Sequence, residues 1–313
     1  MPASGGVRTH RMALLLAGDG GPPAVVAAVD PGQLLAVAVD AVAFGLFLAL
    51  LGVGITLVFG LGDVLNLAVG TFAVAGVLVA VALVDLGVGV APAAVGGVLA
   101  VAALGVAVDR TLLSLVYRSE GQERVLLGIF VTLGLAIAVD GLLVKPFPGS
   151  YTLPVEFGVV RVGPAPLAAA SLATIAIASV VLLGLVLFLR HTYLGRAART
   201  VFQDETGAVL VGVEPRRVRS LVFVLSAAVA GIAGLAYAAG ATVGVASGFE
   251  FTTFAVIVSV VGGVRSVPGA AAAGLLLGVV VQFASFLVGT FVAEMLLFVV
   301  AVAALLARPE VLG

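Results

Sequence analysis

Residues that could carry out acid–base, nucleophilic or metal chemistry are scarce in this sequence of 313 residues. Cysteine is absent, the only histidines are His10 and His191, and the only lysine is Lys145. A phosphate-binding P-loop needs a lysine directly after its glycines, whereas Lys145 precedes a proline. We therefore expect a protein that is not an enzyme, with no catalytic residues, no metal site, no cofactor and no ATP hydrolysis of its own.

Two polar residues, Asp63 and Asn66, lie in a glycine-broken stretch, Gly60–Gly70, within a long apolar region. Irregular backbone at membrane depth must be buried in protein or line a cavity. Asp63, Asn66 and Gly70 are therefore candidates for the lining of a pathway. In the alternative interpretation, the stretch is a plain turn and both polar residues only cap helices.

A second glycine-rich break precedes another Ala/Gly-rich segment in the other half of the chain. Paired interruptions of this kind are typical of inverted repeats around a midplane pathway. The candidate residues that this break adds are Gly262, Gly263, Pro268 and Gly269. Four further acids fall near predicted outer ends of apolar segments, where a solvated helix end is the simpler interpretation: Asp40, Asp140, Glu250 and Glu294.

The most polar stretch is Arg190–Arg219, which holds six of the fifteen Lys and Arg residues. Asp204 is a good N-cap, Gly212 suits the position after a helix, and Pro215 closes the segment. This pattern predicts a short helix, Glu205–Val211, within a cytoplasmic loop. Its exposed apolar residues indicate a contact with a groove in a partner; a solvated linker that only fixes topology is the alternative.

Composition requires lipid as the solvent for most of the chain. Hydrophobic residues make up 62% of the sequence and charged residues 10%, against about 45–50% and 25% in soluble domains. The expected environment is thus a cell membrane, crossed many times. The net charge of −1 gives no electrostatic reason to expect nucleic acid as a partner.

We predict an all-α, polytopic transmembrane helix bundle of about eight or nine spans, with possible broken or re-entrant segments. Residues 1–33 are expected to be an N-terminal tail, not a cleaved signal, and residues 34–313 the membrane domain. Prolines and alternating residues in Lys145–Pro166 predict an extended or hairpin-like loop. The nine predicted spans are Leu34–Phe59, Thr71–Val84, Pro92–Val108, Val125–Val144, Leu167–Leu189, Ser220–Thr242, Thr252–Val264, Ala270–Val288 and Phe291–Ala307.

The charge distribution predicts the orientation. With nine spans and Arg190–Arg219 inside, eleven Lys and Arg residues lie inside and four outside, in agreement with the positive-inside rule. The N-terminus is then outside and the C-terminus cytoplasmic. An eight-span bundle, with Gly60–Gly70 or Thr252–Val264 re-entrant, would change the placement of the tails.

Three motifs resemble those of the branched-chain amino acid ABC transporter permeases of the H type. They are Asn66-Leu-Ala-Val-Gly70, Asp204 to Val213 followed by Arg216-Arg-Val-Arg219 and Ala227 to Gly234, and Gly262-Gly-Val-Arg-Ser-Val-Pro-Gly-Ala270. The resemblance covers the chain from about Leu34 onward. Two departures are Val69, where the family usually has His, and Arg265, where a Gly is usual.

The resemblance implies a permease subunit of an importer for branched-chain or other small amino acids. Implied partners are a second permease subunit, two cytoplasmic ABC ATPase subunits and an extracytoplasmic solute-binding protein. The implied ATPase-coupling residues are Asp204, Glu205, Gly207, Val209, Leu210 and Gly212.

Two other hypotheses stay open at this stage. An ion-coupled secondary transporter of small solutes would need ionisable groups deep in the bundle, whereas those here cluster at predicted ends, except Asp63. A membrane scaffold without transport is the third hypothesis, and the paired glycine breaks argue against it.

Overall fold

The structure is a computed structural model that describes residues 31–307 except positions 120, 156 and 164. Most of the predicted tail, with Arg8, His10 and Arg11, and also Arg308 near the other end, lies outside the described residues.

Most of the described chain is helical, as predicted. Within the described residues, six helices are long and apolar enough to cross a membrane. They are α2 (Pro31–Gly62), α4 (Val90–Val108) with its continuation, α6 (Gly121–Val144), α7 (Ala169–His191), α10 (Pro215–Ala238) and α12 (Val267–Val288). The helix α4 continues through a π-helical turn, η1 (Asp109–Leu113), into α5 (Ser114–Val116). Three shorter apolar helices are α3 (Val69–Asp85), α11 (Ser247–Gly262) and α13 (Thr290–Ala307).

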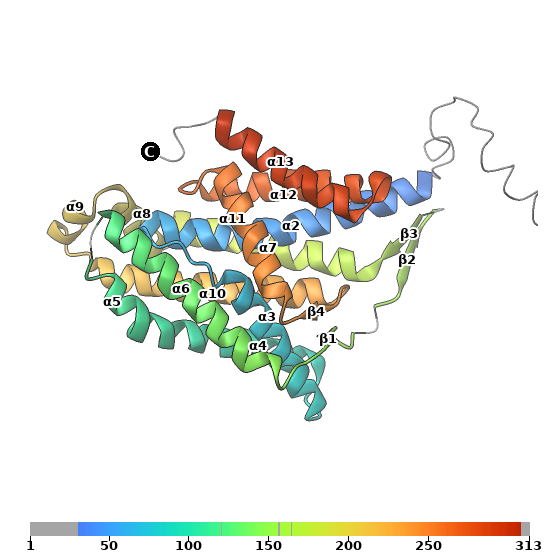
Figure 1. Cartoon of the computed structure of the whole chain (residues 1–313), viewed down its shortest axis with the longest axis horizontal. Coiled ribbons are helices and arrows are strands. Elements are labelled where there is room, and N and C mark those ends of the chain that lie inside the picture. The colour runs from blue at the N-terminus through green and yellow to red at the C-terminus, as the bar shows by residue number, and fades with distance from the viewer. Residues whose placement is uncertain (1–30, 120, 156, 164, 308–313) are drawn as a thin grey trace, which may run out of the picture.

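Helix α2 is the centre of the bundle (Figure 1). It contacts α7, α10, α11 and α12, so most of its surface is covered by other helices. Glycines allow the closest of these approaches: a Cβ on Gly278 would lie 2.1 Å from Gly45 Cα. Gly274 allows a similarly close approach, since a Cβ on Gly274 would lie 2.4 Å from Ala49 Cα.

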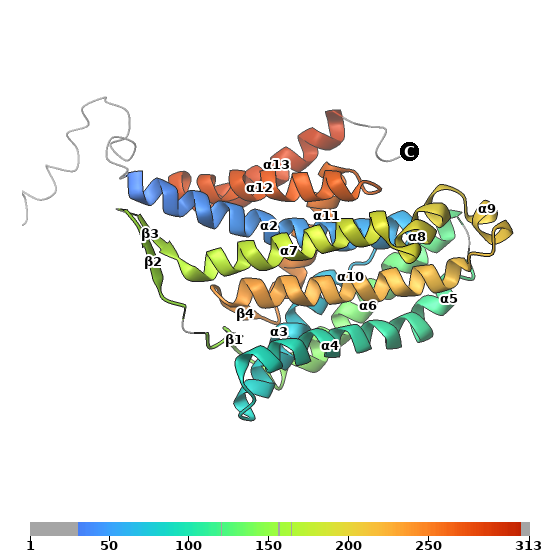
Figure 2. The same ribbon diagram turned by 180° about the vertical axis from the view of Figure 1, so that it is seen from behind.

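Short strands lie at one end of the bundle, which we call the strand end, and two small helices at the opposite α9 end (Figures 1 and 2). The strands β1 (Ser150–Tyr151) and β4 (Val243–Gly244) pair, as do β2 (Val159–Val162) and β3 (Ala165–Ala168), all antiparallel. These strands are an addition to the predicted all-α class. The hairpin occupies 159–168, so Leu167, predicted to begin the fifth span, belongs to β3 and α7 begins at Ala169.

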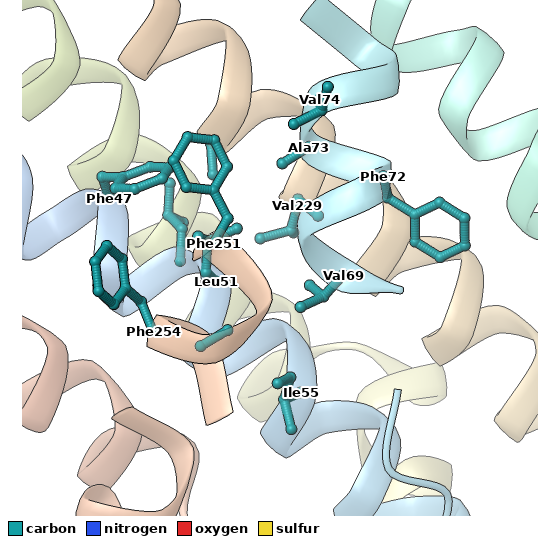
Figure 3. Close-up of a cluster of buried hydrophobic side chains, with 14 of the residues drawn as sticks. Phe47, Leu51, Ile55, Val69, Phe72, Ala73, Val74, Val229, Phe251 and Phe254 are labelled. Carbon is teal, nitrogen blue, oxygen red and sulfur yellow. The ribbon is translucent and has the colours of Figure 1, made fainter. Parts of the chain in front are cut away.

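Aromatic and branched side chains fill the interior around α2, α3 and α11 (Figure 3). Phe47 stacks on Tyr237 with ring centroids 4.5 Å apart and meets Phe251 edge-on at 4.9 Å. Such pairs stabilise packing by about 0.5–1.5 kcal/mol beyond the area that they bury. The interior next to the polar break after α2 is therefore densely packed.

Candidate functional site

The predicted loop Arg190–Arg219 is shorter in the structure, because α7 runs to His191 and α10 begins at Pro215. The connection between them contains two short helices, α8 (Tyr193–Gln203) and α9 (Glu205–Leu210). The sequence analysis missed α8. Its signals were Thr192, whose hydroxyl accepts a hydrogen bond from Gly195 N at 3.0 Å, and a spacing that buries Ala197, Ala198 and Val201 on one face. An N-cap followed by apolar residues three to four apart is typical of an amphipathic helix.

Helix α9 confirms the predicted short helix, although it ends at Leu210 instead of Val211. Gly212 follows it with φ of 80°, the left-handed conformation expected there. Gly207 leaves room for Asp204, because a Cβ on Gly207 would lie 2.6 Å from an Asp204 carboxylate oxygen. Ala208 is buried, whereas the apolar tip of the helix faces outward, with Leu210 83% exposed and Val209 and Val211 also exposed.

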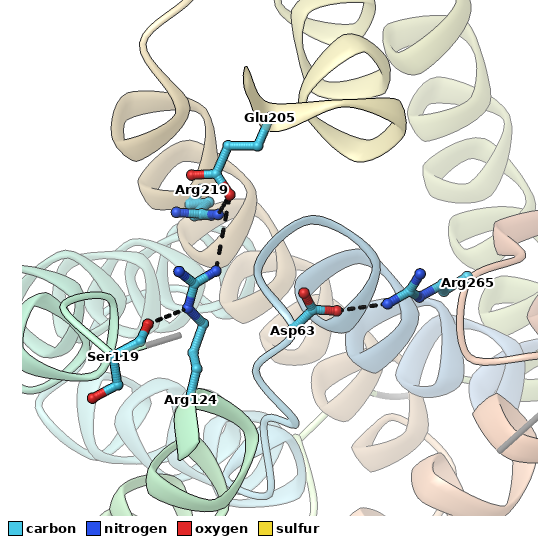
Figure 4. Close-up of polar contacts among 6 residues, drawn as sticks. All are labelled: Asp63, Ser119, Arg124, Glu205, Arg219 and Arg265. Carbon is cyan, nitrogen blue, oxygen red and sulfur yellow. Dashed lines mark hydrogen bonds and ion pairs between the residues drawn. The ribbon is translucent and has the colours of Figure 1, made fainter. Parts of the chain in front are cut away.

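Glu205 anchors this exposed helix to the bundle (Figure 4). Its carboxylate pairs with Arg219 of α10 and lies 3.9 Å from a guanidinium nitrogen of Arg124 in α6. Both arginine side chains are nearly buried, and Arg124 Nε donates to Ser119 O at 2.8 Å. We call these residues with Tyr117 the Glu205 clasp.

Tyr117 forms the floor of the clasp, with the Arg219 guanidinium 5.4 Å from its ring centroid. Burial, with a smaller contribution from the charge of Asp109, raises the pKa of the Tyr117 hydroxyl, so the ring stays neutral. A cation over a neutral aromatic face is stabilised by the quadrupole of the ring. The carboxylate of Asp109 accepts a hydrogen bond from Ser220.

The polar break after α2 runs inward from the α9 end. Asp63 begins it with φ of 50°, and the chain stays non-helical until α3 starts at Val69. Thr132 of α6 fixes the break, since its hydroxyl bonds to both Leu65 O and Leu67 N at 3.0 Å. The break is thus an ordered, protein-lined segment.

Asn66 lies in this break and is completely buried. Its Oδ1 accepts a hydrogen bond from Ala68 N at 3.1 Å, immediately before α3. Its Nδ2 has no hydrogen-bond partner among the described residues. This contact is a local turn before α3, whose N-cap residue is Ala68 and which no side chain caps. Asn66 has, in addition, a buried donor that is unused.

The first turns of α3 and α11 meet in the interior, and we call this contact the α3–α11 junction. Gly70 N donates to the Thr252 hydroxyl at 3.0 Å, and a Cβ on Gly70 would lie 2.0 Å from Gly248 O. Only glycine is compatible with this approach of two backbones. Since helix N-termini carry partial positive charge, two such ends converge here.

The second predicted break is a turn at the α9 end, between α11 and α12. Gly262 and Gly269 abut there, since a Cβ on Gly269 would lie 2.0 Å from Gly262 O, and Gly263 has φ of 93°. The turn contacts the first break through Arg265, whose Nη2 lies 2.8 Å from Asp63 Oδ1 (Figure 4). Pro268 opens α12. The element that meets Gly70 in the interior is thus the start of α11, not this turn.

Three carboxylates that the sequence analysis treated as separate helix ends line one cavity, which we call the strand-end cavity. Asp40, Glu250 and Glu294 come from α2, α11 and α13 and surround a volume of about 310 Å³. Ser171 donates a hydrogen bond to Asp40 Oδ1 at 2.6 Å, and the aromatic ring of Tyr237 is also part of the lining. No pattern of spacing along the chain pointed to this convergence.

No group of three or more metal-ligating side chains, His, Cys, Asp or Glu, is close enough to hold a metal ion in the part of the chain that the structure describes. The three acids of the strand-end cavity are therefore too dispersed for a metal centre. The arrangement can attract a cation electrostatically at the strand end and offer positive helix ends in the interior.

Comparison with known proteins gives matches over most of the chain. The family described as "Branched-chain amino acid transport system / permease component" matches residues 37–306. The high-affinity branched-chain amino acid transport system permease protein LivH of Salmonella typhimurium is 29% identical over 290 residues, which cover 86% of this chain and 92% of LivH. The corresponding protein BraD of Pseudomonas aeruginosa is 26% identical over 296 residues, 87% of this chain and 92% of BraD. A solved structure, PsaBC from Streptococcus pneumoniae in complex with Fab, gives a TM-score of 0.45 at 16% identity and covers 86% of this chain and 89% of that chain.

Proposed function

Because the chain belongs to the family of branched-chain amino acid transport system permease components, we propose that it forms the translocation pathway of an ABC importer for branched-chain or other small amino acids. The observation that carries this proposal is α9, an anchored helix with an exposed apolar tip at one end of a membrane bundle. A transporter subunit without a motor needs such a docking element.

The conformational change driven by ATP is transmitted to the pathway through α9 and the Glu205 clasp. Separate ATPase subunits accept Val209 and Leu210 in a groove, and nucleotide-driven closure displaces α9. The clasp connects that displacement to α6 and α10 at once, because Arg124 and Arg219 share one carboxylate. Rigid-body movement of packed helices then changes access to the pathway.

The pathway runs from the strand-end cavity toward the α3–α11 junction. Asp40, Glu250 and Glu294 attract the ammonium group of an amino acid, and the N-termini of α3 and α11 attract its carboxylate. Aromatic side chains, including Phe254 in the cavity lining and Phe251 beside it, separate the two regions. Asn66 Nδ2 supplies an unused donor on the far side of this barrier.

The membrane arrangement follows from the same assignment. Counting α3, α11 and α13 with the six long helices gives nine crossings, two of them by short helices preceded by non-helical chain. The α9 end, rich in arginine, is cytoplasmic and the strand end is outside. The C-terminus is then cytoplasmic and the N-terminus external. The remaining partners are a second permease subunit and an extracytoplasmic solute-binding protein.

The test compares two leucines of equal exposure at opposite ends. Leu210→Asp places a charge in the proposed docking tip, whereas Leu86→Asp makes the same change at a residue 80% exposed after α3. With the ATPases and binding protein co-expressed, Leu210→Asp should abolish ATPase co-purification and uptake of labelled leucine, and leave membrane insertion intact. Leu86→Asp should keep the ATPases bound. Normal co-purification and uptake with Leu210→Asp would reject the coupling assignment.

The convergence of three carboxylates in the strand-end cavity supports one alternative, an ion-coupled transporter. That alternative requires uptake by the chain without ATPases, abolished by an ionophore. Uptake that needs ATP and persists with the ionophore favours the importer.

A further inference from the structure

A second cavity, of about 360 Å³, lies at the α9 end and has the opposite charge character. Three arginines line it, Arg190 from α7, Arg199 from α8 and Arg265 before α12, and we call it the arginine pocket. No carboxylate is part of its lining among the described residues. We propose that this pocket binds the phosphate group of an anionic phospholipid of the leaflet on the α9 side.

The charges of the pocket are arranged for an anion. Arg199 Nη2 donates to Arg190 O at 3.3 Å, which holds its guanidinium at the end of α7. Arg265 is partly neutralised by Asp63, so Arg190 and Arg199 provide the net positive charge. Guanidinium groups bind phosphate oxygens through paired, charge-assisted hydrogen bonds.

The start of α12 adds to this field. Ser266, Val267 and Pro268 line the pocket, and they are the N-cap and first residues of a 22-residue helix. Phosphate is stabilised at a helix N-terminus by backbone N–H groups and the helix dipole. The arginines of α7 and α8 favour an anion in the pocket independently of this helix N-terminus.

The remaining lining points to a lipid as the source of the phosphate. Leu57, Val186 and Leu189 contribute apolar surface beside the arginines. On the outside of α7, exposed apolar side chains continue from the pocket toward the middle of the helix, namely Leu187, Leu183 and Val180. A headgroup phosphate in the pocket would leave its acyl chains along this row, whereas a soluble phosphate would leave the apolar lining unused. Basic pockets between membrane helices are suited to such headgroups.

The experiment measures lipid retention by native mass spectrometry on the full chain in detergent, titrated with phosphatidylglycerol. The double variant Arg190→Gln/Arg199→Gln should lose at least about tenfold in retention, because two charge-assisted contacts are removed. Arg118→Gln, an exposed arginine at the same end that does not line the pocket, should match the unmodified chain. Both target arginines are exposed, so folding should persist; the single variants repeat the test if it does not.

Two further arms identify the ligand. Phosphatidylcholine, whose headgroup is neutral overall, should be retained less than phosphatidylglycerol, and soluble glycerol phosphate should not displace the bound lipid. Equal retention of both lipids, or equal losses in Arg118→Gln and the double variant, would overturn the proposal. Displacement by glycerol phosphate at the lipid's own concentration would assign the pocket to a soluble phosphate and also overturn it.

Discussion

The α3–α11 junction and the Glu205 clasp hold the chain together in opposite ways. At the junction, the backbones of α3 and α11 touch through Gly70 and Gly248. At the clasp, long side chains of Glu205, Arg124 and Arg219 span the gaps between elements. Backbone contact is rigid, whereas ion pairs between flexible side chains tolerate small displacements. The α3–α11 junction is therefore the fixed part of the molecule and the α9 end the movable part. A pathway that is driven from outside the membrane requires this division.

The largest effect is expected from Gly70→Ala, which tests whether the junction is rigid. The new Cβ would lie 2.0 Å from Gly248 O and 2.6 Å from Thr252 N, both backbone atoms. Overpacking of this kind costs about 3 kcal/mol or more. The midpoint temperature of thermal unfolding in detergent should therefore fall sharply.

Gly184→Ala in α7 is the matched control for that prediction. A Cβ there meets no atom within 4 Å, and alanine favours the helix over glycine by about 0.8–1 kcal/mol. Its stability should be unchanged or slightly raised. Similar midpoint temperatures for Gly70→Ala and Gly184→Ala would show that the junction adjusts to an added methyl group and is not rigid.

Glu205→Gln breaks the clasp and should have the next largest effect. Removing the charge weakens the interaction with the nearly buried Arg219 and Arg124, at a cost of about 2–3 kcal/mol, toward the lower end because Glu205 is partly exposed. ATP hydrolysis by the bound ATPases should continue while uptake of labelled leucine falls.

Glu214→Gln is the control for this prediction. It removes an exposed ion pair with Arg217 and should cost less than about 1 kcal/mol of stability, with uptake retained. Unchanged uptake in Glu205→Gln would separate the clasp from coupling.

Asn66→Leu returns to the interior and separates the turn contact before α3 from a role in transport. The bond from Ala68 N to Asn66 Oδ1 is lost, which costs about 1 kcal/mol. If the free amide faces the pathway, uptake should fall several-fold while ATPase co-purification stays normal. A variant with the expected small loss of stability and normal uptake would leave Asn66 with a structural role in the turn alone.

The same contrast explains what the sequence could predict. Composition determines a helical membrane bundle, and a single sequence displays the boundaries of α9. Asp204 stands at the N-cap position, without a side-chain cap bond, and Gly212 follows the helix. The structure places Leu210 at an exposed tip and buries Asn66, and the roles assigned to both residues stay predictions.

Long-range convergence was not predictable in this way. Helices such as α2 are apolar on all sides, and lipid and protein interiors are similarly apolar, so no periodic face reveals which helices are neighbours. Asp40, Glu250 and Glu294 thus looked like unrelated helix ends although they line one cavity. For the same reason, Gly262 was matched to the first break, whereas Gly248 is the residue that meets Gly70.

The smallest effect is expected at the Asp63–Arg265 pair, which joins the two regions. Both side chains are about half exposed, so their interaction should be worth less than about 1 kcal/mol and should weaken in high salt. A double-mutant cycle with Asp63→Asn and Arg265→Gly isolates this coupling energy, and Arg265→Lys is the control that keeps the charge. A coupling energy of several kcal/mol, insensitive to salt, would show that the α9 end is locked as firmly as the junction. The division into a rigid interior and a movable end would then fail, because the first break would be fixed at both of its ends.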